Sequence, residues 1–180
     1  MERTFRARCG IDRDIIQGRT VTTKMKAEIL NAFFVGASNA IAREIKSPVQ
    51  RTGLHMAPSN VVTDEVVVYI AFVGQVRGAI LIGMSIAMAR QLAGTMLGEP
   101  QAELTEMGMS ALAELGNLIA GGAAMELEKL NYPCDITPPS LMVGRRARLS
   151  TLGLPRFVIP LTTAGGEMRI HVAVDVAFTR

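Results

Sequence analysis

The sequence predicts an α+β fold in which two helix-strand-hairpin units form one mostly antiparallel sheet, with the long helices packed on one face. Three observations support this prediction. Two long segments carry apolar residues at helical spacing, each is followed by a strand that a proline introduces, and each unit ends in two adjacent strands with glycine in the turn between them. Because the strands arrive in neighbouring pairs without a helix between them, a parallel doubly wound sheet is disfavoured.

The first unit begins with a helix over residues 26–46, whose apolar residues recur at helical spacing until Pro48 prevents continuation. The segments that follow are rich in β-branched and aromatic residues, which favours strands. These strands are predicted over residues 48–54, 61–72 and 77–84, with a glycine-containing turn before the last of them.

A shorter helix over residues 85–97, capped by Ser85 and closed by Gly98, connects the two units. The second unit then repeats the order of the first. Its helix runs from Thr105 to about Leu130, and its strands are predicted over residues 133–143, 156–163 and 168–178.

The two units also match residue by residue. Residues 33–42 align with residues 111–120, which places Asn39 on Asn117 and Gly36 on Glu114. We therefore expect one domain over residues 25–180 with pseudo-repeats at about residues 25–84 and 105–178, after an extension of unknown role over residues 1–24. The alternation from Phe5 to Ile11 indicates a short edge strand within that extension.

Composition limits the class of protein. The chain has 180 residues, of which 49% are hydrophobic and 19% charged, so it is long and apolar enough to bury a sizeable core. The stretches without charge, such as residues 78–89, are all shorter than the roughly 18 to 20 residues that cross a bilayer. The N-terminus has no secretory pattern. These features predict a cytoplasmic protein that does not insert into a membrane.

The residues that usually hold metals or nucleic acid are scarce. Cys9 and Cys134 are far apart and predict reduced thiols, and His55 and His171 each stand alone, as structural histidines do. No metal site and no cofactor are expected on this chain. The net charge of only +3 and the absence of tryptophan argue against nucleic acid as a partner.

The helix after Thr105 has two different faces. Leu112, Leu115 and Ile119 belong to an apolar stripe that should face the sheet, whereas small and polar residues form a line on the opposite side. We call that line the polar stripe; it consists of Ser110, Glu114, Asn117 and Gly121. The adjacent pair Gly121-Gly122 costs roughly 1 kcal/mol per glycine relative to alanine in a helix, and such a cost requires a reason.

Two interpretations of the polar stripe are open. It is either an ordinary solvated helix face, or a site at which a partner's backbone approaches the small residues while the amide orients a water. An amide has no useful basicity, so the second interpretation requires an electrophile that is already reactive. An acyl phosphate would meet that requirement.

At these residues the sequence resembles the CheC/CheX/FliY family of chemotaxis phosphatases. The family pattern is Asp or Ser, three residues, Glu, two residues, Asn, and about twenty-two residues later Pro; here Ser110, Glu114, Asn117 and Pro139 match it, the proline one residue early. The flanking segments, residues 114–124 and 135–144, resemble the CheX branch in particular. The likeness extends from about Met25 to the C-terminus.

The resemblance implies a phosphatase that acts on the phosphorylated receiver domain of a CheY-like response regulator. It implies that Asn117 orients the attacking water and that Glu114 forms an ion pair with the receiver's lysine, while the receiver supplies the phospho-aspartate and Mg²⁺. Ser110 and Gly121 would contact the partner. The basic cluster Arg145, Arg146 and Arg148 is either a further partner contact or a solvated turn.

Two rival functions stay open. The first is a CheX-like adaptor that binds a receiver or a flagellar-switch partner without hydrolysis. The second is a phosphatase of free small molecules, which is disfavoured because the sequence has no evident nucleophile, metal cluster or phosphate-binding glycine loop. Because Gly36 stands where Glu114 would be repeated, we expect one active site per chain, with Asn39 a surface residue left from a duplication.

For assembly, the largely apolar strand over residues 168–178 is predicted as a sheet edge that pairs two chains into a homodimer. The alternative is that the N-terminal extension covers this edge.

Overall fold

The structure is a computed structural model that describes residues 19–46, 48–62, 64–145, 148–151, 154 and 156–176; for residues 19–26 and 60–62 it describes the backbone alone. The predicted N-terminal edge strand over residues 5–11 lies outside the described residues. No helix in the described part of the chain is long and apolar enough to cross a membrane.

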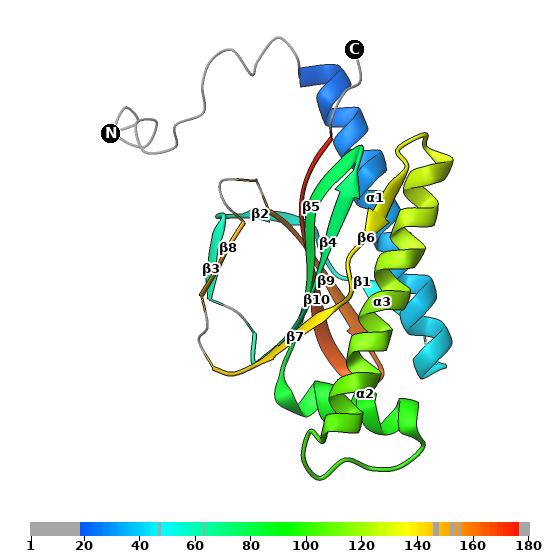
Figure 1. The fold of residues 1–180 in the computed structure, drawn as a ribbon, viewed down its shortest axis with the longest axis vertical. Helices are drawn as coiled ribbons and strands as arrows, with labels where there is room; N and C mark the ends of the chain where they lie inside the picture. Colours follow the sequence, from blue (N-terminus) through cyan, green and yellow to red (C-terminus); the bar gives the residue numbers. More distant parts are fainter. Residues whose placement is uncertain are drawn as a thin grey trace.

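Three helices and ten strands follow one another in the described residues (Figure 1). The helices are α1 (Arg19–Ile45), α2 (Ile86–Leu97) and α3 (Glu106–Lys129). The strands are β1 (Gln50–Arg51), β2 (His55–Ala57), β3 (Asn60–Val62), β4 (Val66–Gly74), β5 (Val76–Met84), β6 (Cys134–Ile136), β7 (Ser140–Val143), β8 (Arg148–Ser150), β9 (Arg156–Thr163) and β10 (Gly166–Val176).

Most element boundaries agree with the expectation from local sequence. The Ser85 side chain caps α2 by accepting a hydrogen bond from the Met88 N–H at 3.1 Å, and Gly98 ends the helix at a φ of 76°. Thr105 caps α3 in the same way. Three differences concern the first unit. The helix α1 begins at Arg19, ahead of the expected start and across the proposed boundary between residues 24 and 25; the strand predicted over residues 48–54 is the shorter β1, with β2 after it; and the strand predicted over residues 61–72 is divided into β3 and β4. In the second unit, the strand predicted over residues 133–143 is divided into β6 and β7.

The main sheet has the order β1-β9-β10-β5-β4-β6, with β2 also beside β9 and β7 also beside β4. Every pairing in it is antiparallel. The two hairpins, β4-β5 and β9-β10, join through β5 and β10, in a register that runs from Val76 opposite Val176 to Met84 opposite Met168. The predicted α+β class, with its mostly antiparallel sheet, is therefore confirmed.

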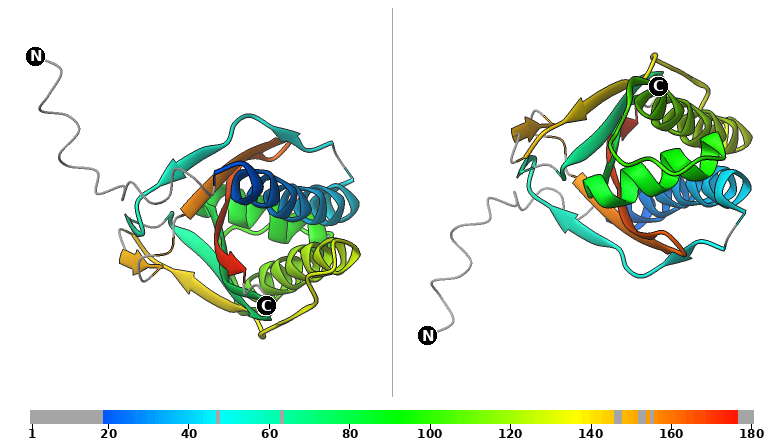
Figure 2. Two further views of the ribbon diagram at one scale, coloured as in Figure 1. Left: turned by 90° about the horizontal axis from the view of Figure 1, so that it is seen from above. Right: turned by 90° about the horizontal axis from the view of Figure 1, so that it is seen from below.

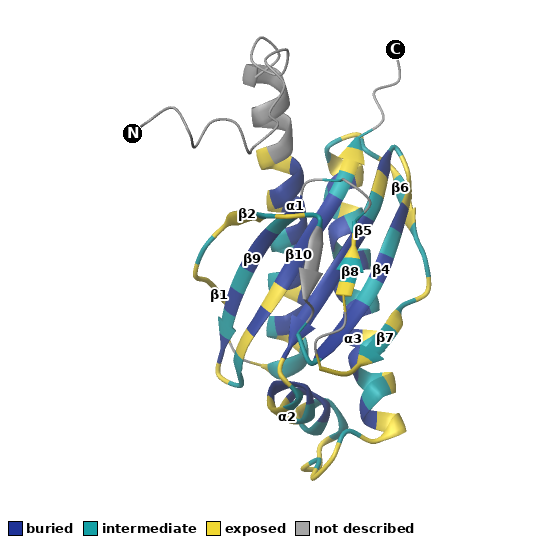
Figure 3. Ribbon diagram, turned by 90° about the vertical axis from the view of Figure 1, so that its left-hand side faces the viewer, coloured by how far each residue is buried: buried dark blue, intermediate teal, exposed yellow. Residues whose placement is uncertain are grey.

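The helices form a second layer. End-on views show α1 and α3 side by side over one face of the sheet, with α2 across one end of them (Figure 2). The core lies between these layers, where Phe33 of α1 meets Phe72 of β4 edge to face with ring centroids 5.1 Å apart. On the opposite face, β8, which pairs with β3 in a small separate sheet, lies over the middle of the main sheet (Figure 3).

The predicted edge strand is not at an edge. Residues 168–176 belong to β10, which pairs with β5 on one side and with β9 on the other, so the prediction that this strand joins two chains was wrong. The physical reason is that the two hairpins pair with each other, so that β10 has a strand on each side within one chain. The edges consist instead of β1 and β2 beside β9, and of β6 and β7 beside β4.

The two long helices approach each other closely at a pair of glycines. A Cβ atom placed on Gly36 of α1 would lie 2.7 Å from the backbone carbon of Gly122 and closer still to the backbone nitrogen of Ala123. A Cβ on Gly122 would lie 3.1 Å from the Cα of Gly36. By contrast, a Cβ on Gly121 would meet no atom within 4 Å. Of the two adjacent glycines, Gly122 is therefore required by helix packing and Gly121 is not.

This difference predicts opposite effects of alanine at the two kinds of position. Gly36→Ala should lower the free energy of unfolding by about 1 to 3 kcal/mol, because its methyl group meets backbone atoms that cannot move without separating the helices. Gly121→Ala should instead raise it by up to about 1 kcal/mol, because alanine favours the helix and meets no obstacle. Urea unfolding followed by circular dichroism measures both, and equal stabilities of the two variants would contradict the close crossing.

Candidate active site

The polar stripe is on α3, and this α3 stripe lies on the outer face of its helix, as predicted. Leu112, Leu115 and Ile119 are buried against the sheet. On the other side, Ser110 and Glu114 are exposed, and Asn117 and Gly121 are half-buried. The amphipathic pattern thus places the polar residues of the stripe on the surface that a partner protein can reach.

Gly116, between Glu114 and Asn117, allows this part of α3 to pack closely against the sheet. A Cβ atom on Gly116 would lie 2.6 Å from Cγ1 of Val68 and 3.2 Å from Cδ1 of Ile70, both on β4. Only glycine allows the helix to approach the strand this closely. This close contact fixes the distance between α3 and the sheet near Glu114 and Asn117. A site of defined geometry requires its residues to be held in place in this way.

The carboxylate of Glu114 and the amide of Asn117 have no partner within the described part of the chain. Neither side chain makes a hydrogen bond or an ion pair there. An exposed carboxylate and a half-buried amide without partners, one turn apart on a helix, are therefore available to an incoming molecule. The carboxylate can accept an ion pair, and the amide can both donate and accept a hydrogen bond.

A groove of about 360 Å³ runs between α1 and α3 beside the stripe. Asn117, Gly121 and Gly122 line it from α3, and Asn39 and Arg43 line it from α1. The helix crossing at the paired glycines forms its floor, because Gly36 is also among the lining residues. Asn39, interpreted from the sequence as a surface remnant of the duplication, is exposed and shares this groove with Asn117. The sequence alignment paired the two asparagines but did not show that one groove contains both.

Other predicted site residues lie elsewhere. Pro139 is half-buried in the loop between β6 and β7. Arg145 binds Glu65, with its Nε 3.1 Å from Oε1, and Arg146 lies outside the described residues. Arg148 is exposed on β8, which lies over the sheet face away from the long helices. The structure thus does not place Arg145 or Arg148 beside the stripe.

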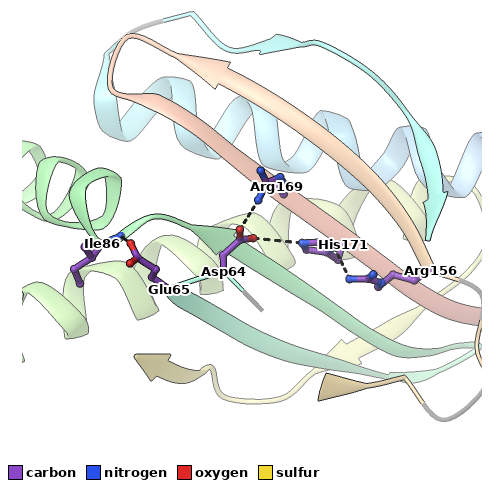
Figure 4. Close-up of polar contacts among 6 residues, drawn as sticks. All are labelled: Asp64, Glu65, Ile86, Arg156, Arg169 and His171. Atoms are coloured by element: carbon purple, nitrogen blue, oxygen red, sulfur yellow. Dashed lines mark hydrogen bonds and ion pairs between the residues drawn. The ribbon is translucent and has the colours of Figure 1, made fainter. Parts of the chain in front are cut away.

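Arg145 instead borders a second cavity, of about 620 Å³, which opens beside the N-terminus of α2. Glu65 holds this region together, because its other oxygen accepts a hydrogen bond from the backbone N–H of Ile86 at 2.9 Å (Figure 4). Asp64 and Gly83 also line the cavity, and Asp64 occupies the space that a side chain at residue 83 would need. Acidic and basic groups alternate around the cavity, so it presents no single charge to a ligand.

Next to this cavity, a chain of polar contacts crosses the sheet face away from the helices (Figure 4). Arg169 donates to the Asp64 carboxylate, and Nε2 of His171 lies 3.7 Å from the same carboxylate. Nη1 of Arg156, a buried residue, lies 2.9 Å from Nδ1 of His171, and its Nε donates to the carbonyl of Pro58 at 3.2 Å. Since a guanidinium can only donate, Nδ1 of His171 accepts, and the proton of the ring is on Nε2.

These contacts shift two pKa values. Burial acts to raise the pKa of the Asp64 carboxyl, but the ring N–H of His171, 3.7 Å away, and the charge of Arg169 outweigh it, and the pKa lies below its ordinary value. Burial lowers the pKa of the Arg156 guanidinium. His171 is thus the buried histidine with a hydrogen-bond partner that the sequence indicated, whereas His55 is exposed.

No group of three or more His, Cys, Asp or Glu side chains is placed to hold a metal ion among the described residues. Cys134 is a free, half-buried thiol on β6. Burial raises its pKa, and the neighbouring charges of Asp135 and Glu128 raise it further, which disfavours the reactive thiolate.

Comparisons with known proteins place this chain in a family. The family model described as chemotaxis phosphatase CheX matches residues 66–162, and a CheY-P phosphatase CheX of Thermotoga maritima is 31% identical over 132 residues, which are 72% of this chain and 84% of that protein. The chain belongs to the CheX family of chemotaxis phosphatases. The matched region contains the whole α3 stripe, so the family resemblance inferred from the stripe and its flanks is confirmed.

Solved structures of CheX proteins have the same fold. The chemotaxis protein CheX of Desulfovibrio desulfuricans superimposes with a TM-score of 0.75 at 20% identity, covering 82% of this chain and 99% of that one. The CheX of a CheX-CheY-BeF₃-Mg²⁺ complex from Borrelia burgdorferi superimposes with a TM-score of 0.65 at 24% identity, covering 81% and 96%. At these identities the likeness concerns the fold, including the sheet and the pair of long helices.

The polar chain around Asp64 predicts a loss of stability in acid. Because the folded-state pKa of Asp64 is lowered, its stabilising contribution is complete above the unfolded pKa near 3.8 and is lost as the pH falls through the folded-state pKa. Asp64→Asn should lower the free energy of unfolding at pH 7 by about 1.5 to 3 kcal/mol, the range for hydrogen bonds to charged groups. It should also flatten the pH dependence below pH 4.

Urea unfolding between pH 2.5 and 7 tests this prediction. Asp135→Asn is the matched control, since Asp135 is an exposed carboxyl on β6. A variant at Asp64 that keeps the acid sensitivity of the wild type would show that the contacts with Arg169 and His171 do not stabilise the fold.

Proposed function

We propose that this chain hydrolyses the aspartyl phosphate of a CheY-like receiver domain. The observation that carries the proposal is the pair formed by Glu114 and Asn117, exposed or half-buried one turn apart on α3, without partners among the described residues and beside an open groove. The T. maritima relative, 31% identical, is a CheY-P phosphatase, and the B. burgdorferi relative forms a complex with CheY, BeF₃ and Mg²⁺. Both support a phosphorylated receiver as the substrate.

In the proposed mechanism, the amide of Asn117 orients a water for attack on the phosphorus of the phospho-aspartate. The amide cannot remove a proton from the water, so its contribution is positioning, and the reactivity resides in the acyl phosphate. Charge on the transferring phosphoryl group is stabilised by Mg²⁺, which the receiver binds. Hydrolysis breaks the bond from phosphorus to the aspartyl oxygen and releases inorganic phosphate and the free carboxylate.

Glu114 has a different part in this proposal. Its carboxylate forms an ion pair with a lysine of the receiver and so fixes the position of α3 over the phosphorylation site. The open side of Gly121, where even a methyl group would meet no atom within 4 Å, lets the receiver's backbone approach the helix. Ser110 extends the contact by one further turn of the stripe.

The energy demanded of these residues is modest. An ordered water and a few polar contacts need to accelerate the receiver's own hydrolysis by about 100-fold, which corresponds to about 2.7 kcal/mol of transition-state stabilisation. Positioning alone can supply this amount. No general base, nucleophile or metal on this chain is needed.

Asn117→Ala should therefore lower the turnover of a phosphorylated receiver by about 100-fold, to the receiver's own rate of hydrolysis, with the fold intact. Loss of phosphate from a receiver phosphorylated in the presence of Mg²⁺ is the measurement. The chain offers a matched control in Glu28 and Asn31, which have the same spacing and are both exposed, but lie on α1 outside the groove. The double variant Glu28→Ala/Asn31→Ala should keep the wild-type rate. Equal rates for wild type and Asn117→Ala would remove the catalytic assignment.

Glu114→Ala should weaken binding as well as turnover, because the ion pair holds the partner. The affinity of the wild type should fall with added salt, and that of Glu114→Ala should fall less. Binding to a beryllofluoride-activated receiver measures both. A wild type that binds the receiver but releases no phosphate would instead support the rival function, an adaptor of the CheX fold.

We also propose that two chains form a homodimer through a sheet edge. The available edges are the short strands β1 and β2 on one side and β6 and β7 on the other, whose outer backbone groups have no ladder partner in the described part of the chain. Light scattering of the full chain should give twice its mass of 19.3 kDa at micromolar concentration; the mass of a single chain would exclude the dimer. The cytoplasmic location stays a prediction.

A further inference from the structure

Two exposed methionines lie in line with the α3 stripe. Among the described residues, six large apolar side chains are exposed, and only two of them are on a helix: Met107, 65% exposed, and Met125, 62% exposed. The other four, Leu54, Met56, Val73 and Val143, are on strands or in loops between them. Neither methionine on α3 contributes to the core.

Helical geometry places both methionines on the same face as the candidate chemistry. Met107 and Met125 are 18 residues apart, which is five full turns, so their side chains leave the helix in the same direction. The four residues of the stripe fall within about 80° of that direction at about 100° per residue. The result is a continuous surface of about 27 Å, apolar at both ends and polar in the middle.

Met125 has a second connection to the site, because it lines the groove between α1 and α3 together with Asn117 and Gly121. Methionine suits such a surface: its unbranched, polarisable side chain adapts to a protein partner of irregular shape. On the helices of the described part of the chain, these two are the large apolar side chains that remain exposed.

We propose that Met107 and Met125 are the two apolar anchors with which α3 docks a phosphorylated receiver domain. This inference rests on the proposed function, because it takes the receiver as the occupant of the stripe. A specific interface buries about 800 Å² on each partner, equivalent to a disc of about 16 Å radius. Along the helix, Met107 and Met125 are about 13 and 14 Å from the midpoint between Glu114 and Asn117. A receiver that brings its phospho-aspartate to Asn117 therefore covers both.

Charge excludes the obvious alternative occupant, a second copy of this chain. A two-fold contact along the stripe would bring the unpaired Glu114 carboxylates of two chains toward each other in a surface that is being dehydrated. A receiver offers a lysine to the same carboxylate. The charge of Glu114 in the middle of the surface thus selects the partner. The two methionines at its ends bury apolar area, which contributes binding free energy that polar contacts exposed to water do not.

The proposal separates binding from chemistry. Met107→Ala and Met125→Ala should each raise the Kd for a CheY-type receiver activated with beryllofluoride and Mg²⁺ by about tenfold. The double variant should raise it about a hundredfold, because the two residues are too far apart to interact. At saturating receiver, kcat should stay within about twofold of the wild type. Leucine at either position should restore most of the affinity.

Met56→Ala is the matched control. Met56 is also a methionine with 65% exposure, but it lies on β2 at a sheet edge, away from α3. If the loss of any exposed methionine lowered the affinity, for instance through a homodimer contact, this variant would do so too. It should bind the receiver as the wild type does.

The outcomes distinguish this inference from the proposed function. Wild-type hydrolysis together with an unchanged Kd and KM in the double variant would overturn the docking role and leave the phosphatase assignment intact. A reduced kcat with an unchanged Kd would also overturn it. A wild type that neither binds nor dephosphorylates the receiver would refute the proposed function, and the docking role with it.

Discussion

The antiparallel pairing of β5 with β10 is the contact on which the rest of the structure depends. Each hairpin alone would be a two-stranded ribbon with one apolar face exposed to water, and such ribbons have little stability in isolation. Nine residue pairs from Val76 opposite Val176 to Met84 opposite Met168 connect the two ribbons into one sheet. That sheet is wide enough for α1 and α3 to lie side by side on it, and the relation between these helices determines the site.

The crossing of α1 and α3 accounts for the asymmetry between the two repeats. Gly36 aligns in sequence with Glu114, but the two residues have opposite surroundings: Gly36 is buried against the backbone of Gly122 and Ala123, and Glu114 is exposed. A carboxylate at residue 36 would separate the helices and would be buried without a partner. Helix packing therefore allows the carboxylate of Glu114 on α3 but not a carboxylate at residue 36 on α1. This is a physical reason to expect one site per chain.

Glycine has three different effects along one helix of this protein. Gly116 lowers α3 onto β4, Gly122 lets α1 approach, and Gly121 leaves an open place on the outer face. The first two hold α3 rigidly by its inner faces. The outer face, with the stripe and the methionines at its ends, does not contribute to these packing contacts, so its residues can be adapted to a partner.

Local sequence determined much of this protein. Periodicity and capping residues predicted α2, α3, β5, β9 and β10 to within about two residues, because caps and turns depend on neighbouring groups alone. The resemblance at Ser110, Glu114 and Asn117 led to the family. The sequence also determined that these three side chains share one helix face, because their spacing does so wherever the helix lies.

Only the tertiary structure decided which strand is an edge, what lies opposite Gly36, and that Asn39 shares a groove with Asn117. It also showed that Arg145 binds Glu65 away from the stripe. These properties depend on which elements become neighbours, and a strand such as β10 reads the same in sequence whether it has one neighbour or two. The order of strands depends on how the apolar faces of all the elements are buried together, and no local pattern of residues specifies that arrangement.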